Sequence, residues 1–287
     1  MPKHAPTKLD TAPFLGAAQI ARSVWERGEH SQSTDWVASE TAVALMYNCI
    51  SHVVMMATPD NLADFAIGFS LSEGIVESVD DILDIEIVEE DRGVVISILI
   101  PEGPFEALKT QRRNMTGRTG CGMCGAETLD QAMRAPKVVE GPLQVSHTAI
   151  QKAVTGFSSG QKLNDQTGGV HAAVWCDLDG NSKLLREDVG RHNALDKLIG
   201  ALAVQNKSLA TNTSPSSVDD QGFVLVTSRA SYEMVAKVAS ANIKVLVAVS
   251  APTTLAIDIA KQSGVSLLGF SKQGRHSVYF GENRIIS

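Results

Sequence analysis

Two cysteines with glycine before, between and after them are the residues of this chain best suited to chemistry. Cys121 and Cys124 lie three residues apart in the run Gly-Cys-Gly-Met-Cys-Gly over residues 120–125. A helix is expected to begin just after this run, near Ala126, so at least one sulfur should lie near the positive end of a helix dipole. Such a position favours the thiolate, which is the reactive form of cysteine. The pattern therefore predicts sulfur chemistry.

Two other roles for the cysteine pair have less support in the sequence. A structural zinc site needs four Cys or His ligands, usually in two close pairs, and the chain has one such pair and no His-x3-5-His spacing. A thioredoxin-like motif should follow a first strand, whereas this pair lies past residue 115. The isolated Cys49 and Cys176 are expected to be buried small hydrophobes. We predict no structural metal.

The composition is that of a soluble globular enzyme. Of 287 residues, 44% are hydrophobic and 20% are charged, which is enough chain for two domains. No apolar run approaches the ~20 residues of a membrane helix, and the N-terminus lacks a signal-peptide hydrophobic region, so we expect a cytoplasmic protein without membrane contact. The net charge of -7 argues against a general nucleic-acid binder. Any anion site must be local.

The first half of the chain predicts a poorly ordered extension followed by a small α+β domain. Residues 1–33 are polar and broken, and residues 34–140 form the predicted domain, which ends with the cysteine loop. The expected elements are strands over 36–48 and 51–57, a helix from about Pro59 to Gly74, a hairpin over 82–100 and a helix over 104–113. This domain would present Cys121 and Cys124.

The second half predicts an α/β domain over residues 141–287. Strands alternate with helical segments, which implies a largely parallel sheet covered on both faces. The expected strands are 170–177, 182–188, 224–230, 245–251, 265–270 and 276–280, the expected helices are 147–157, 193–204, 231–242 and 252–262, and an exposed loop is expected over 209–221. Two of these strands end in serine and lead directly into a helix, so the second half repeats one unit.

These repeated units predict an anion site at one sheet edge. Helix N-termini that follow adjacent parallel strands offer free N–H groups to a phosphate or carboxylate. Ser228 and Ser250 stand at these positions, although serine there also simply caps helices. A later loop places Lys272 and Arg275 on either side of Gly274, which suits a diphosphate or a solvated turn.

A third charged segment lies between a strand and a helix. Residues 186–197 combine acids, bases, His192 and Asn193. Exposed ion pairs at a helix start contribute little stability, so we favour a site-lining role over a purely structural one. The individual roles within this segment stay unassigned.

Five motifs together carry a family resemblance. They are Gly-Arg-Thr-Gly-Cys-Gly-Met-Cys-Gly over 117–125, Thr-Gly-Gly-Val-His-Ala-Ala over 167–173, the segment 186–197, Ser-Arg-Ala-Ser-Tyr-Glu-Met over 228–234 and Ser-Ala-Pro-Thr over 250–253. In this order, across residues 35–280, they resemble the FdhD family of formate dehydrogenase accessory sulfurtransferases. Several long motifs in order are more specific than a single Cys-x-x-Cys.

The resemblance implies a function and a site. Members of this family take sulfane sulfur from a cysteine desulfurase and pass it to the bis-molybdopterin guanine dinucleotide cofactor before its insertion into formate dehydrogenase. Cys121 matches the position of the family's persulfide, and Cys124 would assist it, by accepting the sulfur or by forming a transient disulfide. The segment matching the family's cofactor-binding residues comprises Phe270, Ser271, Lys272, Gln273, Gly274 and Arg275.

The resemblance also implies a fold and an assembly. Family members are similar to cytidine deaminases in their C-terminal domain, which implies an α/β protein with a three-layer, cytidine deaminase-like C-terminal domain and a smaller N-terminal α+β domain. They commonly form homodimers.

Two alternative functions follow from the same residues. Zinc deaminases use His-x-Glu followed downstream by Pro-Cys-x-x-Cys. Here His171 is followed by two alanines, and the cysteine pair lies upstream of it with no proline before it, so deamination is disfavoured. The other alternative is a chaperone that binds the molybdenum cofactor without moving sulfur, in which the two cysteines only shape their loop.

Overall fold

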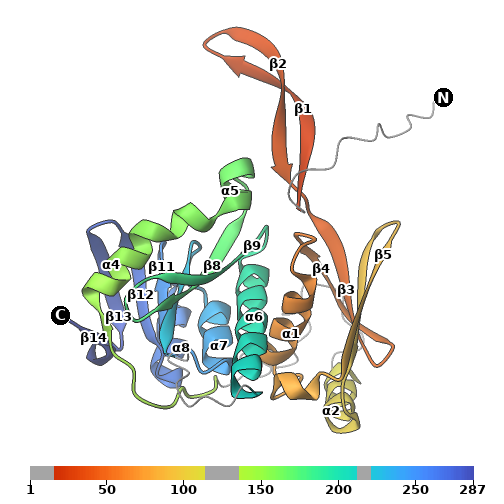
Figure 1. Ribbon diagram of the computed structural model, residues 1–287, viewed down its shortest axis with the longest axis vertical. Helices are drawn as coiled ribbons and strands as arrows, with labels where there is room; N and C mark the ends of the chain where they lie inside the picture. The colour runs from red at the N-terminus through yellow and green to blue at the C-terminus, as the bar shows by residue number, and fades with distance from the viewer. Residues whose placement is uncertain (1–15, 114–135, 212–220) are drawn as a thin grey trace.

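The computed structural model describes residues 16–113, 136–211 and 221–287. These residues form two layered units, each built around its own sheet, and a two-stranded hairpin that projects away from both (Figure 1). Helices from the two units lie side by side in the middle of the molecule. The division into domains at residues 33 and 140 stays a prediction, as does the likeness to cytidine deaminases.

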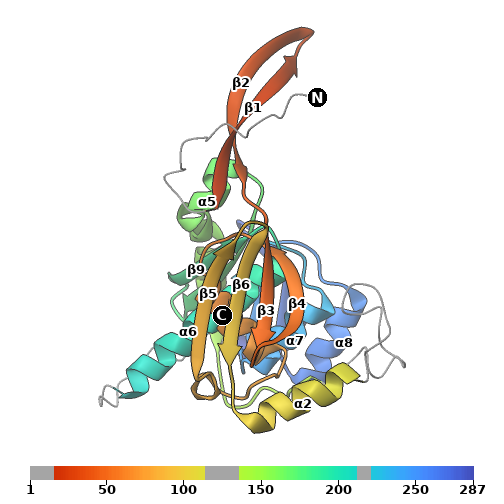
Figure 2. The ribbon, with the colours of Figure 1, turned by 90° about the vertical axis from the view of Figure 1, so that its right-hand side faces the viewer.

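The smaller unit is a four-stranded sheet with a helix on one face. Its strands lie in the order β4-β3-β6-β5 (Figure 2), and α1 covers the face turned towards the larger unit (Figure 1). The elements are β3 (Thr41–Tyr47), β4 (Ile50–Ala57), α1 (Leu62–Ser72), the 3-10 turn η1 (Val79–Asp81), β5 (Asp84–Glu90), β6 (Gly93–Leu99) and α2 (Glu102–Arg113). Alternate residues of β3 and β6 are buried, because successive side chains of a strand point to opposite faces. The predicted helix after Pro59 and the predicted hairpin over 82–100 are both confirmed.

The projecting hairpin differs from the extension predicted for the N-terminus. Strands β1 (Ala17–Glu26) and β2 (Glu29–Ala38) pair in register along their whole length around a turn at Arg27 and Gly28. Residues 1–15 lie outside the described ranges, so the difference concerns residues 17–33. Most positions on both faces of the hairpin are exposed, so polar and apolar residues do not alternate along its strands. Without that alternation, the sequence gives no strand signal here.

The larger unit is a six-stranded mixed sheet in the order β13-β12-β11-β10-β8-β9. Its strands are β8 (His171–Asp177), β9 (Ser182–Asp188), β10 (Gly222–Val226), β11 (Val245–Ala248), β12 (Ser266–Lys272) and β13 (Arg275–Phe280). The pairs β10–β11 and β11–β12 are parallel, whereas β8–β10, β8–β9 and β12–β13 are antiparallel. The prediction of a largely parallel sheet is therefore wrong. The turns that join β8 to β9 and β12 to β13 are too short for a parallel crossover.

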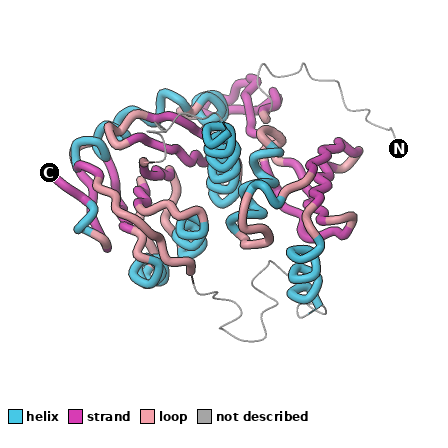
Figure 3. Tube along the Cα trace, turned by 60° about the horizontal axis from the view of Figure 1, so that its bottom comes forward, coloured by secondary structure: helices cyan, strands magenta, loops and turns pink. Residues whose placement is uncertain are grey.

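Helices cover both faces of the larger sheet, as predicted (Figure 3). Helices α6 (Arg191–Thr211), α7 (Tyr232–Ser240) and α8 (Thr254–Ser263) pack on one face, and α4 (His147–Gly156) packs on the other. Shorter elements complete the chain: β7 (Val145–Ser146), η2 (Phe157–Gly160), α5 (Lys162–Thr167), η4 (Glu282–Arg284) and β14 (Ile285–Ile286). The loop predicted over 209–221 begins within α6, and residues 212–220 lie outside the described ranges.

Helices α1 and α6 join the two units through a backbone-to-backbone contact at two glycines. A Cβ atom on Gly68 would lie 1.7 Å from the carbonyl oxygen of Asp196, and one on Gly200 would lie 1.9 Å from that of Asp64. No side chain fits either position, so glycine is required by the close approach of the two helices.

A buried lysine secures the end of this contact. Lys237 of α7 donates hydrogen bonds to Ser72 Oγ, Glu73 Oε1 and Asp196 Oδ2 at 2.8, 2.8 and 3.0 Å. Burial opposes the charge, but the carboxylates of Asp196 and Glu73 outweigh it and raise the pKa of Lys237. The ammonium group therefore ties the C-terminal end of α1 to both α6 and α7.

Replacing Gly68 with alanine should separate the two units or unfold the protein. The new methyl group meets backbone atoms that cannot rotate away, so we expect a loss of about 3 kcal/mol, the upper end of typical overpacking costs, in the free energy of unfolding. Urea denaturation followed by circular dichroism measures the change. The matched control is Gly156→Ala at the end of α4, where an added Cβ meets nothing within 4 Å. That variant should be unchanged or slightly stabilised, and equal stability of the two variants would contradict the proposed packing.

Candidate functional site

Several segments with polar and basic residues meet at one edge of the larger sheet. The parallel strands β10, β11 and β12 all end there, because parallel strands present their carboxyl ends at a common edge. The antiparallel neighbour β8 begins at this edge with His171, and β9 ends there just before Arg191. We call this the carboxyl edge of the larger sheet.

The predicted cofactor-binding residues form the hairpin between β12 and β13 at the carboxyl edge. Lys272 and Arg275 pair across the turn, and both are exposed. Gly274 has a φ of +77°, which suits glycine at this turn. Ser271 is only 1% exposed. The structure therefore brings the two cations of the predicted site together.

Phe270 occupies an unusual conformation in the same hairpin. Its φ is +50°, a left-handed value that is uncommon for an aromatic residue, and its side chain is 42% exposed. The pairing of β12 with β13 is irregular between Gly269 and Lys272, and the Phe270 N–H within this stretch donates to the Ser250 carbonyl at 3.0 Å. An exposed aromatic ring in the same hairpin as two exposed cations is suited to stacking on a nucleobase while the cations meet phosphate groups.

Ser228 and Ser250, for which helix capping was the alternative to an anion site, do not cap helices. Ser231 stands at the N-cap of α7, and Thr253 caps α8 by accepting a hydrogen bond from the Ala256 N–H at 3.2 Å. Ser228 Oγ instead donates to the carbonyl of Arg229. The helices begin one and two residues later than predicted, at Tyr232 and Thr254, and a bridge between Ala230 and Pro252 precedes them.

A cluster of histidine, arginine and glutamate lies at the β8 side of the carboxyl edge. His192 Nε2 is 2.8 Å from Glu233 Oε2. The contact with His192 keeps the pKa of Glu233 below its ordinary value, and burial together with the charges of Arg191 and His192 lowers the pKa of His171. Near neutral pH the cluster thus combines an ionised carboxylate with an uncharged His171.

Some buried polar atoms at this edge have no hydrogen-bond partner within the described part of the chain. They include Arg191 Nε, Ser231 Oγ and Ser271 Oγ. Buried polar atoms normally have a hydrogen-bond partner. A buried polar atom without one therefore often indicates a bound polar ligand or water. Their position agrees with a site for an anionic molecule at the carboxyl edge.

Most polar residues of the segment 186–197 serve the structure and do not line a site. Lys197 is fully buried and contacts Asp60 Oδ1 at 2.7 Å and Asp188 Oδ2 at 2.8 Å. Asn193 donates to the Met56 carbonyl at 2.8 Å and to Asp188 Oδ1 at 3.1 Å. The amide of Asn193, whose individual role the sequence left unassigned, therefore joins the two units.

Glu187 makes a further internal contact in this segment. Its carboxylate accepts hydrogen bonds from the backbone N–H groups of Leu163 and Asn164, both at 2.9 Å. Burial raises the pKa of Glu187, although these two hydrogen bonds oppose the shift. Of the segment's residues, Arg191 and His192 are the ones that remain at the carboxyl edge.

The predicted sulfur-bearing residues, Cys121 and Cys124, lie outside the described residues. Of the other two cysteines, Cys176 is buried as predicted, and burial raises the pKa of its thiol to about 12. Cys49 is exposed in the turn between β3 and β4, with a φ of +67°, so the prediction that it is buried is wrong. Its exposure makes it a useful comparison thiol.

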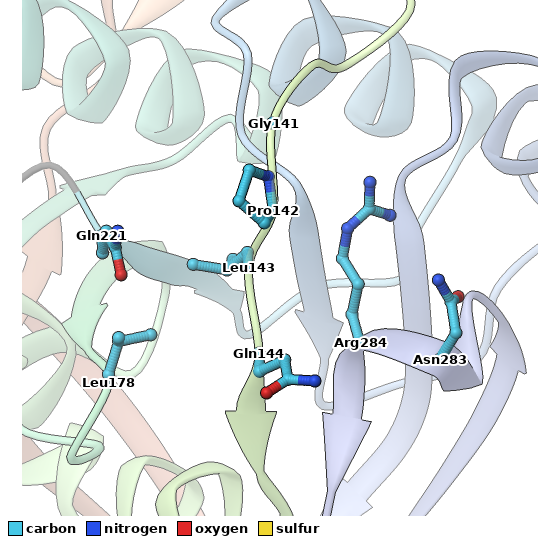
Figure 4. Close-up of a pocket in the computed structure, with 8 residues that line it drawn as sticks. All are labelled: Gly141, Pro142, Leu143, Gln144, Leu178, Gln221, Asn283 and Arg284. Atoms are coloured by element: carbon cyan, nitrogen blue, oxygen red, sulfur yellow. The ribbon is translucent and has the colours of Figure 1, made fainter.

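A pocket of about 530 Å³ lies away from the carboxyl edge (Figure 4). Residues 141–144 line it together with Leu178, Gln221, Asn283 and Arg284. Leu178 follows β8 and Gln221 precedes β10, which places the pocket at the opposite edge of the sheet. The Arg284 Nη1 group donates to the carbonyl of Gly264 at 2.6 Å. The pocket includes none of the residues predicted to act.

Two further observations concern only the described ranges. No three His, Cys, Asp or Glu side chains within them are placed to hold a metal ion. None of the helices found there has the length and apolar character to cross a membrane.

Replacing Lys197 with methionine should destabilise the protein strongly. The change leaves the fully buried carboxylate of Asp188 without its cation, and breaking a buried pair in this way typically costs about 3–5 kcal/mol. Urea unfolding measures the loss. The matched control is Lys261→Met, which removes an exposed pair with Asp258 and should cost less than about 1 kcal/mol. Similar losses in both variants would mean that the Lys197 contacts do not join the units.

Comparison with known proteins identifies the family of this chain. The model of the FdhD/NarQ family matches residues 38–286. The chain is 49% identical over 266 residues to a protein of Cupriavidus necator named sulfur carrier protein FdhD, with 93% of this chain and 89% of the relative covered. It is 48% identical over 259 residues to a protein of the same name from Bordetella petrii, with 90% and 89% covered.

A solved structure shares the fold. The crystal structure of a protein from Desulfotalea psychrophila, described as a proposed formate dehydrogenase accessory protein, superimposes with a TM-score of 0.69 at 22% identity. The match covers 94% of this chain and all of the other. With a family match over most of its length and relatives at nearly half identity, this chain belongs to the FdhD/NarQ family.

Proposed function

We propose that this protein is a sulfur carrier for the maturation of formate dehydrogenase. In this proposal it accepts sulfane sulfur from a cysteine desulfurase as a persulfide on Cys121 and passes it to bis-molybdopterin guanine dinucleotide, which it binds as cargo. The observation that carries the proposal is the 49% identity, over 93% of the chain, to a relative named sulfur carrier protein FdhD.

The first chemical step is a sulfur exchange without net oxidation. The thiolate of Cys121 attacks the outer sulfur of the donor's Cys-S-SH group, so that a new S–S bond forms, the donor's S–S bond breaks, and the donor cysteine leaves as a thiolate. Cys124 then has two possible roles. It either takes the outer sulfur in the same manner, or attacks the inner sulfur of Cys121 to form a disulfide and release hydrosulfide. The sulfur ends as a terminal ligand of the cofactor metal.

The carboxyl edge supports the second half of the proposal, the binding of a guanine dinucleotide. Lys272 and Arg275 offer two exposed cations to the diphosphate, and the exposed ring of Phe270 offers a stacking surface to guanine. The neutral His171 and the unpartnered Arg191 Nε add hydrogen-bonding groups on the same edge. The edge is therefore suited to one large anionic ligand with an aromatic base.

The proposal includes partners and a compartment. A cysteine desulfurase supplies the sulfur, formate dehydrogenase receives the sulfurated cofactor, and the protein acts in the cytoplasm as a homodimer. Sulfane sulfur would then pass from the desulfurase to Cys121 as a persulfide before it reaches the cofactor.

Incubation with a cysteine desulfurase and cysteine, followed by peptide mass spectrometry, tests the carrier step. We expect a +32 Da adduct on Cys121 that a reductant removes, because the thiolate is the reactive form of cysteine and Cys121 matches the position of the family's persulfide. Cys121→Ala should abolish the adduct and the activation of formate dehydrogenase in cells.

The matched control is Cys49→Ala, which removes the exposed thiol found within the described residues and should preserve both. If Cys121→Ala still activates formate dehydrogenase, the protein acts as a cofactor chaperone and does not carry sulfur.

Titration with GDP, used as a probe for one arm of the cofactor, tests the binding site. We expect Lys272→Ala and Arg275→Ala each to weaken GDP binding by about tenfold at low salt, since each removes a charge-assisted contact with phosphate. Isothermal titration calorimetry measures the affinity. Lys261→Ala, on the outer surface of α8, serves as the charge-matched control and should leave the affinity unchanged. Equal affinities in all variants would exclude the hairpin as the phosphate site.

A further inference from the structure

Helix α4 holds the hairpin between β12 and β13 through a chain of three short hydrogen bonds. The backbone N–H of Gly274, at the turn, donates to Gln151 Oε1 at 2.7 Å. Gln151 Nε2 lies 2.7 Å from His276 Nδ1, and His276 Nε2 lies 2.7 Å from His147 Nδ1. The two imidazole rings also stack, with centroids 5.0 Å apart.

The hydrogen bond from the Gly274 N–H decides which group donates and which accepts in the other two hydrogen bonds. A backbone N–H can only donate, so the oxygen of the Gln151 amide must face Gly274. The amide NH2 group then faces His276 and can only donate, so His276 Nδ1 carries no proton. His276 therefore carries its proton on Nε2 and donates it to His147 Nδ1. Both histidines are uncharged in this arrangement.

We infer that Gln151 is a positioning residue for this hairpin, and that its hold on Gly274 is released when the His147–His276 pair takes up a proton. The functional meaning of this release rests on the function proposed above, because the same hairpin carries Lys272 and Arg275. The contact itself does not depend on that function.

A proton on either histidine has the same result. On His276 it occupies Nδ1 and faces the amide NH2 of Gln151, so that two donors meet. If His147 takes up the proton, its Nδ1 becomes a donor, so His276 Nε2 must accept. The proton of His276 then moves to Nδ1, where it faces the amide NH2 group of Gln151 as before. Rotation of the Gln151 amide relieves the conflict but turns its NH2 group towards the Gly274 N–H. The bond to the turn is lost in both cases.

The elements that carry or adjoin the pair contain basic side chains and no carboxylate. The hairpin contributes Lys272 and Arg275, α4 contributes His147 and the exposed Lys152, and β7 and β14 contribute no titratable side chain. Burial and the neighbouring His147 lower the pKa of His276. A histidine whose pKa is lowered in the folded protein favours the folded arrangement while it is uncharged, at a pH above its pKa. This contribution is lost as the pH falls and the ring takes up a proton. The tether therefore holds near neutral pH and is released in mild acid.

Hydrogen exchange of the Gly274 amide tests this inference without any ligand. The full-length protein is labelled with 15N-glycine, and exchange is followed by NMR from about pH 7.5 down to about pH 5, because the lowered pKa of His276 places its titration below that of an ordinary histidine. Rates are divided by those of an unstructured chain at each pH. Protection of Gly274 should fall by roughly 3- to 10-fold at the lower pH, the factor that one hydrogen bond of typical net strength represents.

Gly168 is the internal control, because its N–H donates to the backbone carbonyl of Asn164 at 2.7 Å and should keep its protection.

Two variants of Gln151 distinguish positioning from a general effect of acid. Gln151→Leu removes the acceptor, so the Gly274 amide should be unprotected at both pH values. Gln151→Glu supplies a carboxylate that accepts from both Gly274 and a protonated His276, so protection should persist at about pH 5. Protection that falls equally in the wild-type protein and in Gln151→Glu would overturn the inference, as would full protection in Gln151→Leu.

Titration with GDP separates this inference from the proposed function. If the hairpin binds phosphate, GDP affinity should fall in mild acid in the wild-type protein and fall less in Gln151→Glu. If GDP binds at neither pH while Gly274 follows the expected pattern, the tether stands and the proposed cofactor site fails.

Discussion

The ammonium group of Lys197, buried with no contact with water, is the interaction on which the arrangement of the two units depends. It lies between Asp60, which precedes α1, and Asp188, which ends β9. Asp188 also accepts hydrogen bonds from the Thr58 and Gly190 N–H groups at 3.0 and 2.7 Å. A charge so deeply buried tolerates only a narrow range of geometries. The start of α1 and the loop before α6 are thereby fixed together, and that loop leads directly to Arg191 and His192 at the carboxyl edge.

The carboxyl edge combines rigid and adjustable parts. Its rigid part consists of the parallel strand ends and the segments that cross-link them, such as the bond from the Phe270 N–H to the Ser250 carbonyl. The β12–β13 turn is held differently, by side chains of α4 that reach it from outside the sheet. A binding site built in this way keeps its backbone platform constant while the position of its cations responds to the surroundings.

The sequence predicted more of the elements than of their contacts. Hydrophobic periodicity located α1, the hairpin of β5 and β6 and the strands of the larger sheet, because burial on one face leaves a repeating pattern. It did not reveal β1 and β2, whose faces are both largely exposed, or the antiparallel direction of β8 and β13, which depends on turn length. The charged residues of the segment 186–197 were hard to interpret from the sequence for a physical reason. Asp188 and Lys197 look like surface charges in sequence, and only the fold shows that each neutralises the other. The His147–His276 contact joins residues too distant in the chain for any local pattern to connect them.

The glycine contact between α1 and α6 has a consequence for how this protein can change in evolution. A side chain at Gly68 or Gly200 would strike the backbone of the opposite helix and not a side chain. A second substitution on the opposite helix cannot make room, because the clashing atoms belong to a backbone carbonyl group, which every amino acid has. Suppressor mutations for either glycine are therefore expected to be absent from the contact itself, and the two positions should behave in genetic screens as sites without local compensation.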